Sequence, residues 1–83
     1  MTATIEAKAT YTFGIDVTTK DKAKLMYRLR RLKSTCLVSD GGKYREDPAF
    51  SQVYVNTQKD SLELDEWLYR IKGIETIGYW RTA

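Results

Sequence analysis

The sequence predicts an α+β domain whose elements follow one another in the order β-α-β-β-α-β. Two observations carry this prediction. Residues 5–17 alternate between apolar and polar side chains, which is the pattern of a long strand with one buried face. Residues 20–33 and 60–72 instead place their apolar side chains at helical spacing, and two short β-rich runs lie between them. With 83 residues in all, we expect one domain, residues 1–83.

The first strand and the first helix are the most regular parts of the chain. Within residues 5–17 every odd position is apolar, so these side chains would face the core. Thr18 or Thr19 then offers a hydroxyl N-cap for a helix over residues 20–33, which no glycine or proline interrupts. The apolar side chains of this helix fall within about a third of the helical wheel: Leu25, Met26, Leu29 and Leu32.

The middle of the chain predicts a hairpin with a long loop. Residues 35–39 form a short, partly β-branched run, and residues 40–42 (Asp-Gly-Gly) are a turn signal that would end it. A polar loop through Pro48 leads to residues 50–56, which have clear β character. We expect Cys36 to be a small core residue of the first of these two strands.

The second helix carries a capping signal at each end. Asp60 with Glu63 is a variant of the capping box, and Gly73 stands where a C′ glycine is expected. Between them the apolar side chains cluster on one helix face: Leu64, Trp67, Leu68 and Ile71.

Residues 74–80 are the expected final strand. With Ile77 facing the core, the alternation places Tyr79 inside as well and Trp80 on the other face. Six elements in this order predict a ferredoxin-like two-layer sandwich, with a four-stranded antiparallel sheet and both helices on one face. Because this topology hosts many unrelated functions, the function has to be argued from particular residues.

Composition excludes several kinds of chemistry. The chain has no histidine, which removes Ser-His-Asp and Cys-His sites, His-ligated zinc and imidazole proton transfer. One cysteine cannot form an internal disulfide or an iron–sulfur site. We therefore expect a protein that is not an enzyme, with no catalytic residues, no metal and no cofactor. The chain lacks a membrane-length apolar stretch and a signal-peptide pattern, so we expect it in the cytoplasm and away from membranes.

The net charge of +3 divides unevenly along the chain. Residues 1–45 carry ten Lys and Arg against four Asp and Glu, whereas residues 46–83 carry four against seven. The sequence therefore describes a dipolar domain more than a basic one. Such a surface suits a specific protein contact or head-to-tail pairing at least as well as nucleic acid.

The basic residues gather on the outer side of the first helix. Lys20, Lys24, Tyr27, Arg28 and Arg31 fall within about 100° of one another on the helical wheel, opposite the leucine stripe. They can form a surface for phosphate or for an acidic partner. They can equally be a solvated face whose charge is balanced by the acidic second helix. The sequence alone does not decide between the two.

The uncovered face of the sheet is expected to be neutral and aromatic, with Tyr54 and Trp80 on it. Face-to-face packing of two copies as a homodimer explains such a face, and so does base stacking. RNA-recognition motifs have this topology, and residues 49–56 resemble their third-strand signature, which implies Tyr54 as a stacking residue. The glycine and the basic residue that open the signature are missing, and Thr12 stands where the first-strand aromatic is expected.

We therefore predict a non-enzymatic interaction or regulatory domain that binds a protein partner or a second copy of itself, such as a phage-type accessory modulator. The alternative is a domain that binds RNA or another nucleic acid through the basic helix and the sheet aromatics. The residues expected to make the contacts are Lys20, Lys24, Tyr27, Arg28, Arg31, Tyr54 and Trp80.

Overall fold

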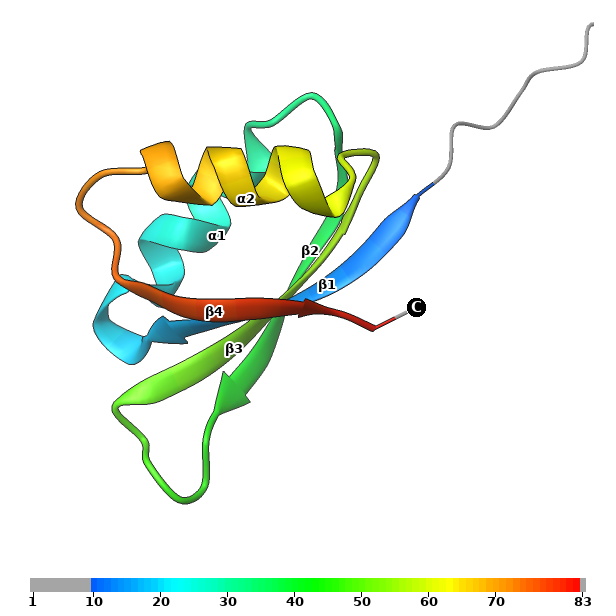
Figure 1. The fold of residues 1–83 in the computed structure, drawn as a ribbon. Helices are drawn as coiled ribbons and strands as arrows, with labels where there is room; N and C mark the ends of the chain where they lie inside the picture. Colours follow the sequence, from blue (N-terminus) through cyan, green and yellow to red (C-terminus); the bar gives the residue numbers. More distant parts are fainter. Residues whose placement is uncertain (1–9, 83) are drawn as a thin grey trace, which may run out of the picture.

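The computed structural model describes residues 10–82, which fold into a four-stranded sheet with two helices (Figure 1). A single 3-10 turn, η1 (Thr19–Asp21), precedes the first helix. The elements in chain order are β1 (Tyr11–Thr18), α1 (Lys22–Arg30), β2 (Thr35–Lys43), β3 (Phe50–Thr57), α2 (Ser61–Arg70) and β4 (Thr76–Arg81).

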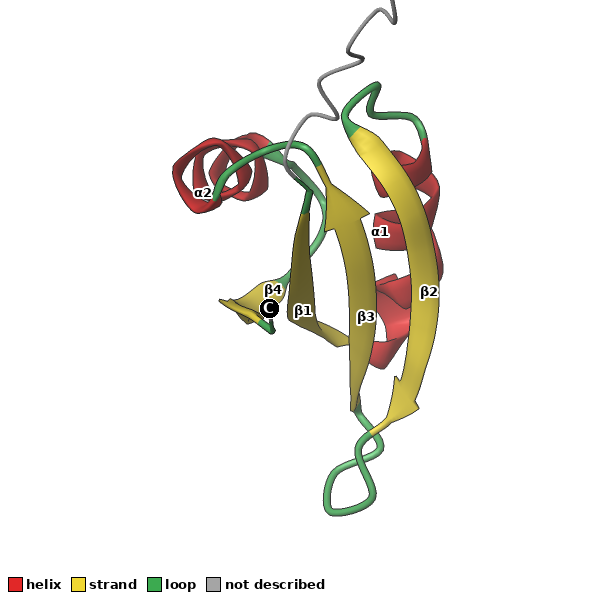
Figure 2. Ribbon diagram, turned by 90° about the vertical axis from the view of Figure 1, so that its right-hand side faces the viewer, coloured by secondary structure: helices red, strands yellow, loops and turns green. Residues whose placement is uncertain are grey.

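The sheet has the strand order β2-β3-β1-β4, and every pair of neighbours is antiparallel. Both helices lie on the same face of the sheet, so that its other face is open (Figures 1 and 2). This is the ferredoxin-like α+β arrangement that the order of elements predicts, and it is confirmed. The long β2–β3 hairpin extends away from the helices at one end of the molecule.

The core lies between the sheet and the helices, and the inward faces expected from the sequence build most of it. The alternation of the first strand is confirmed over residues 11–17, while its earlier positions, residues 5–9, lie outside the described residues. Leu32 and Tyr11 are partly buried at the edge of this core. The buried apolar side chains are Phe13, Ile15, Val17, Leu25, Met26, Leu29, Val38, Val53, Val55, Leu64 and Leu68.

The start of α1 differs from the expected hydroxyl N-cap. The helix begins at Lys22, after η1, and its N-cap residue Asp21 makes no side-chain capping bond. The Thr18 hydroxyl donates to Asp21 Oδ2 at 2.9 Å instead of accepting a backbone N–H, and the Thr19 hydroxyl donates to the Pro48 carbonyl. Both threonines therefore join the end of β1 to neighbouring segments instead of capping the helix.

The prediction that a turn at residues 40–42 ends this strand is wrong, because β2 continues through these residues to Lys43. Asp40 Oδ1 does accept the Gly42 N–H at 2.8 Å, and Gly42 has φ +86°. This local geometry lies inside a shift of the β2–β3 register between Asp40 and Gly42, so it bends the strand without ending it.

A second shift of the β2–β3 register corrects the expectation for Cys36. Thr35 pairs with Thr57 and Leu37 with Asn56, so that Cys36 is the extra residue of a bulge. Cys36 is exposed, and Val38 supplies the buried side chain of β2 in its place.

The second helix follows its N-terminal capping signal, whereas the expected C′ glycine lies one residue further along. Asp60 Oδ1 accepts the Glu63 N–H at 2.9 Å, as expected for the N-cap. Gly73 takes φ +77°, two residues beyond the C-cap residue Ile71 rather than at C′. Leu64 and Leu68 are buried, whereas Trp67 and Ile71 are partly exposed at the edge of the core.

Neither helix in residues 10–82 is long and apolar enough to cross a membrane.

In the final strand, the predicted positions of Tyr79 and Trp80 are confirmed, and that of Ile77 is wrong. Tyr79 faces the core, where its ring meets Phe13 edge-on at 6.0 Å, and Trp80 lies on the open face. Ile77 was expected inside but is 55% exposed. The reason is a bulge, since Asp16 pairs with Gly78 while Val17 pairs with Thr76, which leaves Ile77 unpaired and turned outward.

Candidate interaction surfaces

The two aromatic residues expected on the open face form one platform. Trp80 lies over Gly14 and Tyr54 lies over Gly41, and in each case an added Cβ would collide with the ring. The two rings meet edge to face, with their centroids 6.5 Å apart and their planes at 84°. Because the two glycines leave room for the rings, Tyr54 and Trp80 are half-buried and form one aromatic surface on the open face. We call Tyr54 and Trp80 the aromatic platform.

A chain of hydrogen bonds extends from this platform across the open face. The Tyr54 hydroxyl donates to Gln52 Oε1 at 3.0 Å, and Gln52 Nε2 donates to the Tyr44 hydroxyl at 2.7 Å. Tyr44 in turn donates its hydroxyl proton to Asp16 Oδ1. Burial of the ring, followed by the bond to Asp16, raises the pKa of Tyr44. The chain holds the start of the β2–β3 loop against the sheet.

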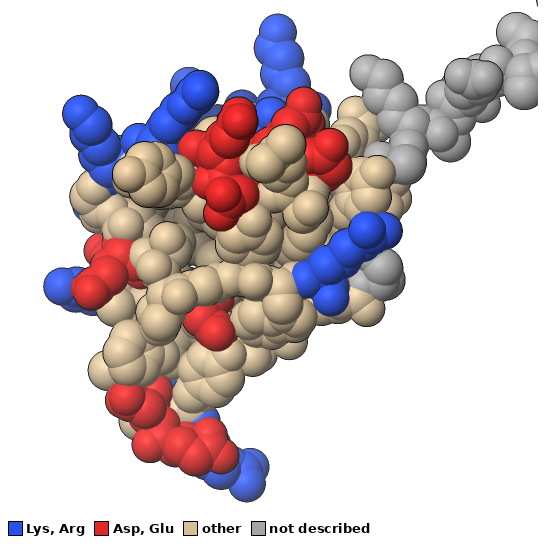
Figure 3. All heavy atoms as spheres, in the orientation of Figure 1, with Lys and Arg blue, Asp and Glu red and all other residues tan. Residues whose placement is uncertain are grey.

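A cavity of about 330 Å³ lies beside the Tyr44–Asp16 pair, between the β2–β3 loop and β4. Its walls are largely apolar and its margin carries three carboxylates, which corrects the expectation of a neutral open face. The acidic side chains at the β2–β3 loop are visible at the lower end of the molecule in Figure 3. We call this cavity, lined by Asp16, Tyr44, Glu46, Asp47, Phe50 and Ile77, the acidic cavity.

The acidic cavity is not a metal site by its residues. No group of three or more His, Cys, Asp or Glu side chains in residues 10–82 is arranged so that it could hold a metal ion. Carboxylates next to apolar and aromatic walls are instead a suitable surrounding for an organic cation, such as a lysine or arginine side chain.

On the helical side, the five residues of the expected basic face differ in their contacts. Lys24 Nζ donates to the Gly73 carbonyl at 3.3 Å and so supports the loop before β4. Arg31 Nη1 donates to the Tyr27 hydroxyl at 3.0 Å, and its guanidinium lies 5.6 Å from the centre of that ring. Lys20 lies in η1, and Arg28 faces a groove between the two helices.

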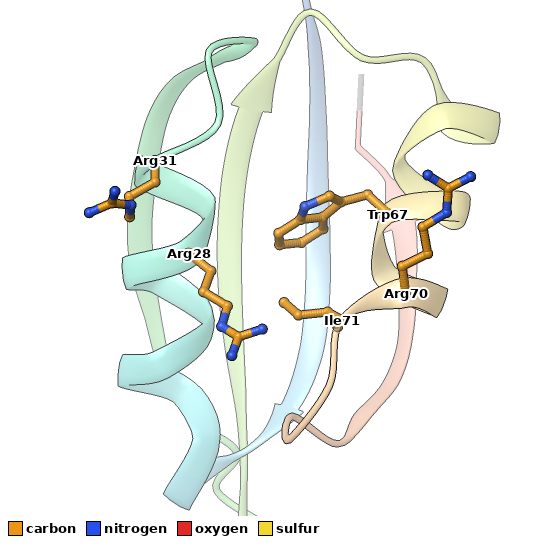
Figure 4. A pocket seen from close by; sticks show the side chains of 5 residues that line it. All are labelled: Arg28, Arg31, Trp67, Arg70 and Ile71. Carbon is orange, nitrogen blue, oxygen red and sulfur yellow. The ribbon is translucent and has the colours of Figure 1, made fainter.

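That groove was not expected from the sequence. It is a cavity of about 310 Å³ lined by Arg28, Arg31, Trp67, Arg70 and Ile71, shown in Figure 4. The helical pattern placed Trp67 and Ile71 with the core, and both are only partly covered because the groove opens beside them. The sequence signal that could have found it is Arg70, a cation three positions after Trp67 at the end of an acidic helix. We call it the arginine groove.

The charge of α1 is not balanced through ion pairs with α2. Within residues 10–82 the one salt bridge joins Lys22 Nζ to Asp40 Oδ2 at 2.9 Å, between α1 and β2. The bond to Lys22, together with the Gly42 N–H, lowers the pKa of Asp40. The acidic residues of α2 form no salt bridge with α1 in this part of the chain. Any balance of charge between the two helices therefore does not take the form of salt bridges.

Comparisons with models of protein families, with curated proteins and with solved structures gave no match. The function must accordingly be argued from the aromatic platform, the acidic cavity and the arginine groove themselves.

Proposed function

We propose that this protein is a non-enzymatic interaction module that binds a partner protein through the open face of its sheet. The observation that carries the proposal is the position of the aromatic platform on the same face as the acidic cavity. An aromatic surface and a cavity on the same face supply two features of protein interfaces, which are an apolar contact area and a pocket for an anchoring side chain.

Exposed apolar side chains extend this surface to both edges of the sheet. Leu37 on β2 is 59% exposed, and Ile77 on β4 is 55% exposed. Leu37 lies beside Asn56 on the open face, and Ile77 lines the acidic cavity. Together with the platform they place apolar side chains in the middle and at both edges of the open face, and exposed apolar surface of this kind marks protein interaction sites.

Charge selects the class of partner. Asp16, Glu46 and Asp47 make the cavity margin acidic, so a nucleic acid strand on this face would be repelled by like charge. A second copy of the chain would bring the same carboxylates to the contact. A partner that inserts a lysine or arginine side chain into the cavity, with apolar neighbours over Tyr54 and Trp80, is complementary in both charge and polarity.

Selection from a random peptide library tests this chemistry without knowledge of the partner. We expect the wild-type protein to enrich peptides that carry one lysine or arginine among apolar residues. The variant Ile77→Glu, which places a charge on the apolar wall, should bind these peptides at least about tenfold more weakly. Tyr69→Ala is the matched control, because Tyr69 is a 91% exposed aromatic residue on α2, away from the open face.

Two outcomes would contradict the proposal. One is enrichment of peptides that bind Ile77→Glu as well as they bind the wild-type protein. The other is a dimer mass in light scattering that falls to the monomer mass in Ile77→Glu, because a second copy would then occupy the open face.

A further inference from the structure

We propose that the arginine groove binds one nucleotide unit, with the base stacked on Trp67 and the phosphate held by the surrounding arginines. This site lies on the helical side of the molecule, away from the acidic cavity, and is independent of the open face.

The shape of the groove comes from a gap between the helices that one aromatic ring partly fills. In Figure 4 the indole of Trp67 points from α2 toward α1, and Arg28 extends from α1 into the space beside Ile71. Arg31 and Arg70 flank the groove on opposite sides with their guanidinium groups directed away from it, so Arg28 is the arginine that reaches into the space. The volume of about 310 Å³ lies at the lower end of the range for small-molecule pockets, which is roughly 300–1,000 Å³. The groove thus has room for one small, flat ligand.

The charged residues that line the groove are all arginines. None of Arg28, Arg31 and Arg70 forms a salt bridge within the described part of the chain. Arg31 donates to the hydroxyl of Tyr27 and lies over its ring, so its guanidinium is directed away from the groove and would turn inward to reach a bound phosphate. Guanidinium groups bind phosphate through paired, planar hydrogen bonds, which makes an arginine cluster a phosphate site more than a general cationic surface.

A nucleotide fits this groove better than an acidic peptide does. The walls are helices, and the backbone groups at their ends are already bonded: Arg31 N–H to the Arg28 carbonyl and Ile71 N–H to the Trp67 carbonyl. An extended peptide therefore finds no strand edge to pair with. Base stacking on an indole needs no backbone partner, and every base has a face for it.

The same chemistry is found in a free nucleotide and in a nucleotide of a single strand. Tyr27 is 60% exposed and lies one helical turn from Arg31, where it offers a second ring for a following base. The experiment therefore compares the two sources directly.

The probe is the fluorescence of Trp67 in the variant Trp80→Phe, because the chain has two tryptophans and this variant keeps only the one in the groove. The variant is titrated with uridine monophosphate, with oligouridylate and with polyglutamate. We expect saturable quenching by the uridine ligands and a weaker response to polyglutamate. Equal affinity for the two uridine ligands would assign the site to free nucleotides, whereas tighter binding of oligouridylate would assign it to single strands. Lack of saturable quenching by both, or equal binding of polyglutamate, would overturn the proposal.

Arg28 and Arg70 lie in the last turns of their helices, where a cation also stabilises the helix end. The substitutions must therefore distinguish a loss of ligand binding from a loss of folding stability. Arg28→Gln and Arg70→Gln should each weaken binding by about tenfold. Arg28→Lys keeps the charge at the helix end but loses the planar fork, so it should melt like the wild-type protein and still bind more weakly.

Arg45→Gln is the matched control, because Arg45 is exposed in the β2–β3 loop, which lies at the end of the molecule away from the helices (Figure 1). If Arg28→Lys kept full affinity and Arg28→Gln and Arg70→Gln bound no more weakly than Arg45→Gln, the assignment of the phosphate to these arginines would be wrong.

Discussion

The indole of Trp80 covers Gly14 on the neighbouring strand. The two residues pair across β1 and β4, and a Cβ at Gly14 would fall inside the contact distance of three atoms of the ring. The same indole also meets the ring of Tyr54 in an edge-to-face contact. The aromatic platform therefore depends on the absence of a side chain at one position of β1.

Replacing Gly14 by alanine should lift Trp80 off the sheet. We expect Gly14→Ala to lower the free energy of unfolding by about 1–3 kcal/mol, as overpacking of a filled site does. Chemical denaturation measures this change. Gly78→Ala is the control, because Gly78 lies on β4 with no atom within 4 Å of an added Cβ. Equal losses in the two variants would show that Trp80 does not rest on Gly14.

The hydrogen-bond chain from Tyr54 to Asp16 predicts a stability change at alkaline pH. The pKa of Tyr44 is raised in the folded state, so the stabilisation from its neutral hydroxyl is complete below pH ~10 and is lost as the pH rises through the folded pKa. Tyr44→Phe should lower stability by about 1 kcal/mol at neutral pH and reduce the alkaline slope. Tyr69→Phe, at an exposed site, should leave both unchanged. An unaltered alkaline slope in Tyr44→Phe would contradict the bond to Asp16.

The hydrogen bonds of Asp21 predict a loss of folding stability at acid pH. The Glu75 N–H donates to its carboxylate at 3.1 Å and the Thr18 hydroxyl at 2.9 Å, and these bonds, in that order, lower the pKa of Asp21. A lowered folded pKa contributes stability above pH ~4 that is lost as the pH falls through the folded value. Denaturation curves of Asp21→Asn should therefore show a smaller loss on acidification than the wild-type protein. Glu66→Gln, on the exposed side of α2, is the control. If Asp21→Asn lost as much stability on acidification as the wild-type protein does, the Asp21 carboxylate would not be the source of the acid dependence.

Cys36 should react as a surface thiol. Because the residue lies exposed in a bulge of β2, a disulfide reagent should modify the folded protein in one fast phase without denaturant. Cys36→Ser should change the free energy of unfolding by less than about 0.5 kcal/mol. Protection of the thiol until the protein unfolds would mean that the bulge turns Cys36 inward.

The elements and the sheet topology follow from the sequence, but three shifts of register do not. A bulge adds one residue to one strand and reverses the alternation beyond it, and a single sequence carries no sign of which residue is extra. For this reason Cys36 and Ile77 appear outside although their patterns place them inside. The same effect keeps Gly42 within β2 although Asp-Gly-Gly is typical of a turn.

The candidate surfaces could be predicted in part. Tyr54 and Trp80 lie on the open face because period-two alternation holds locally around each of them. The arginine groove depends on the separation of α1 and α2, which the helical pattern of either helix does not encode. Trp67 and Ile71 share the apolar face of α2 with Leu64 and Leu68, and only the gap beside them leaves them partly exposed.

The central claim is that the open face binds a cationic, apolar partner segment, and backbone amide chemical shifts measure this most directly. A lysine- or arginine-containing peptide from the library selection is titrated into the labelled protein. We predict that the shift changes concentrate around Gly14, Tyr44, Tyr54 and residues 77–80, and that salt weakens the binding. Changes confined to α1 and α2, with these residues unaffected, would contradict the account.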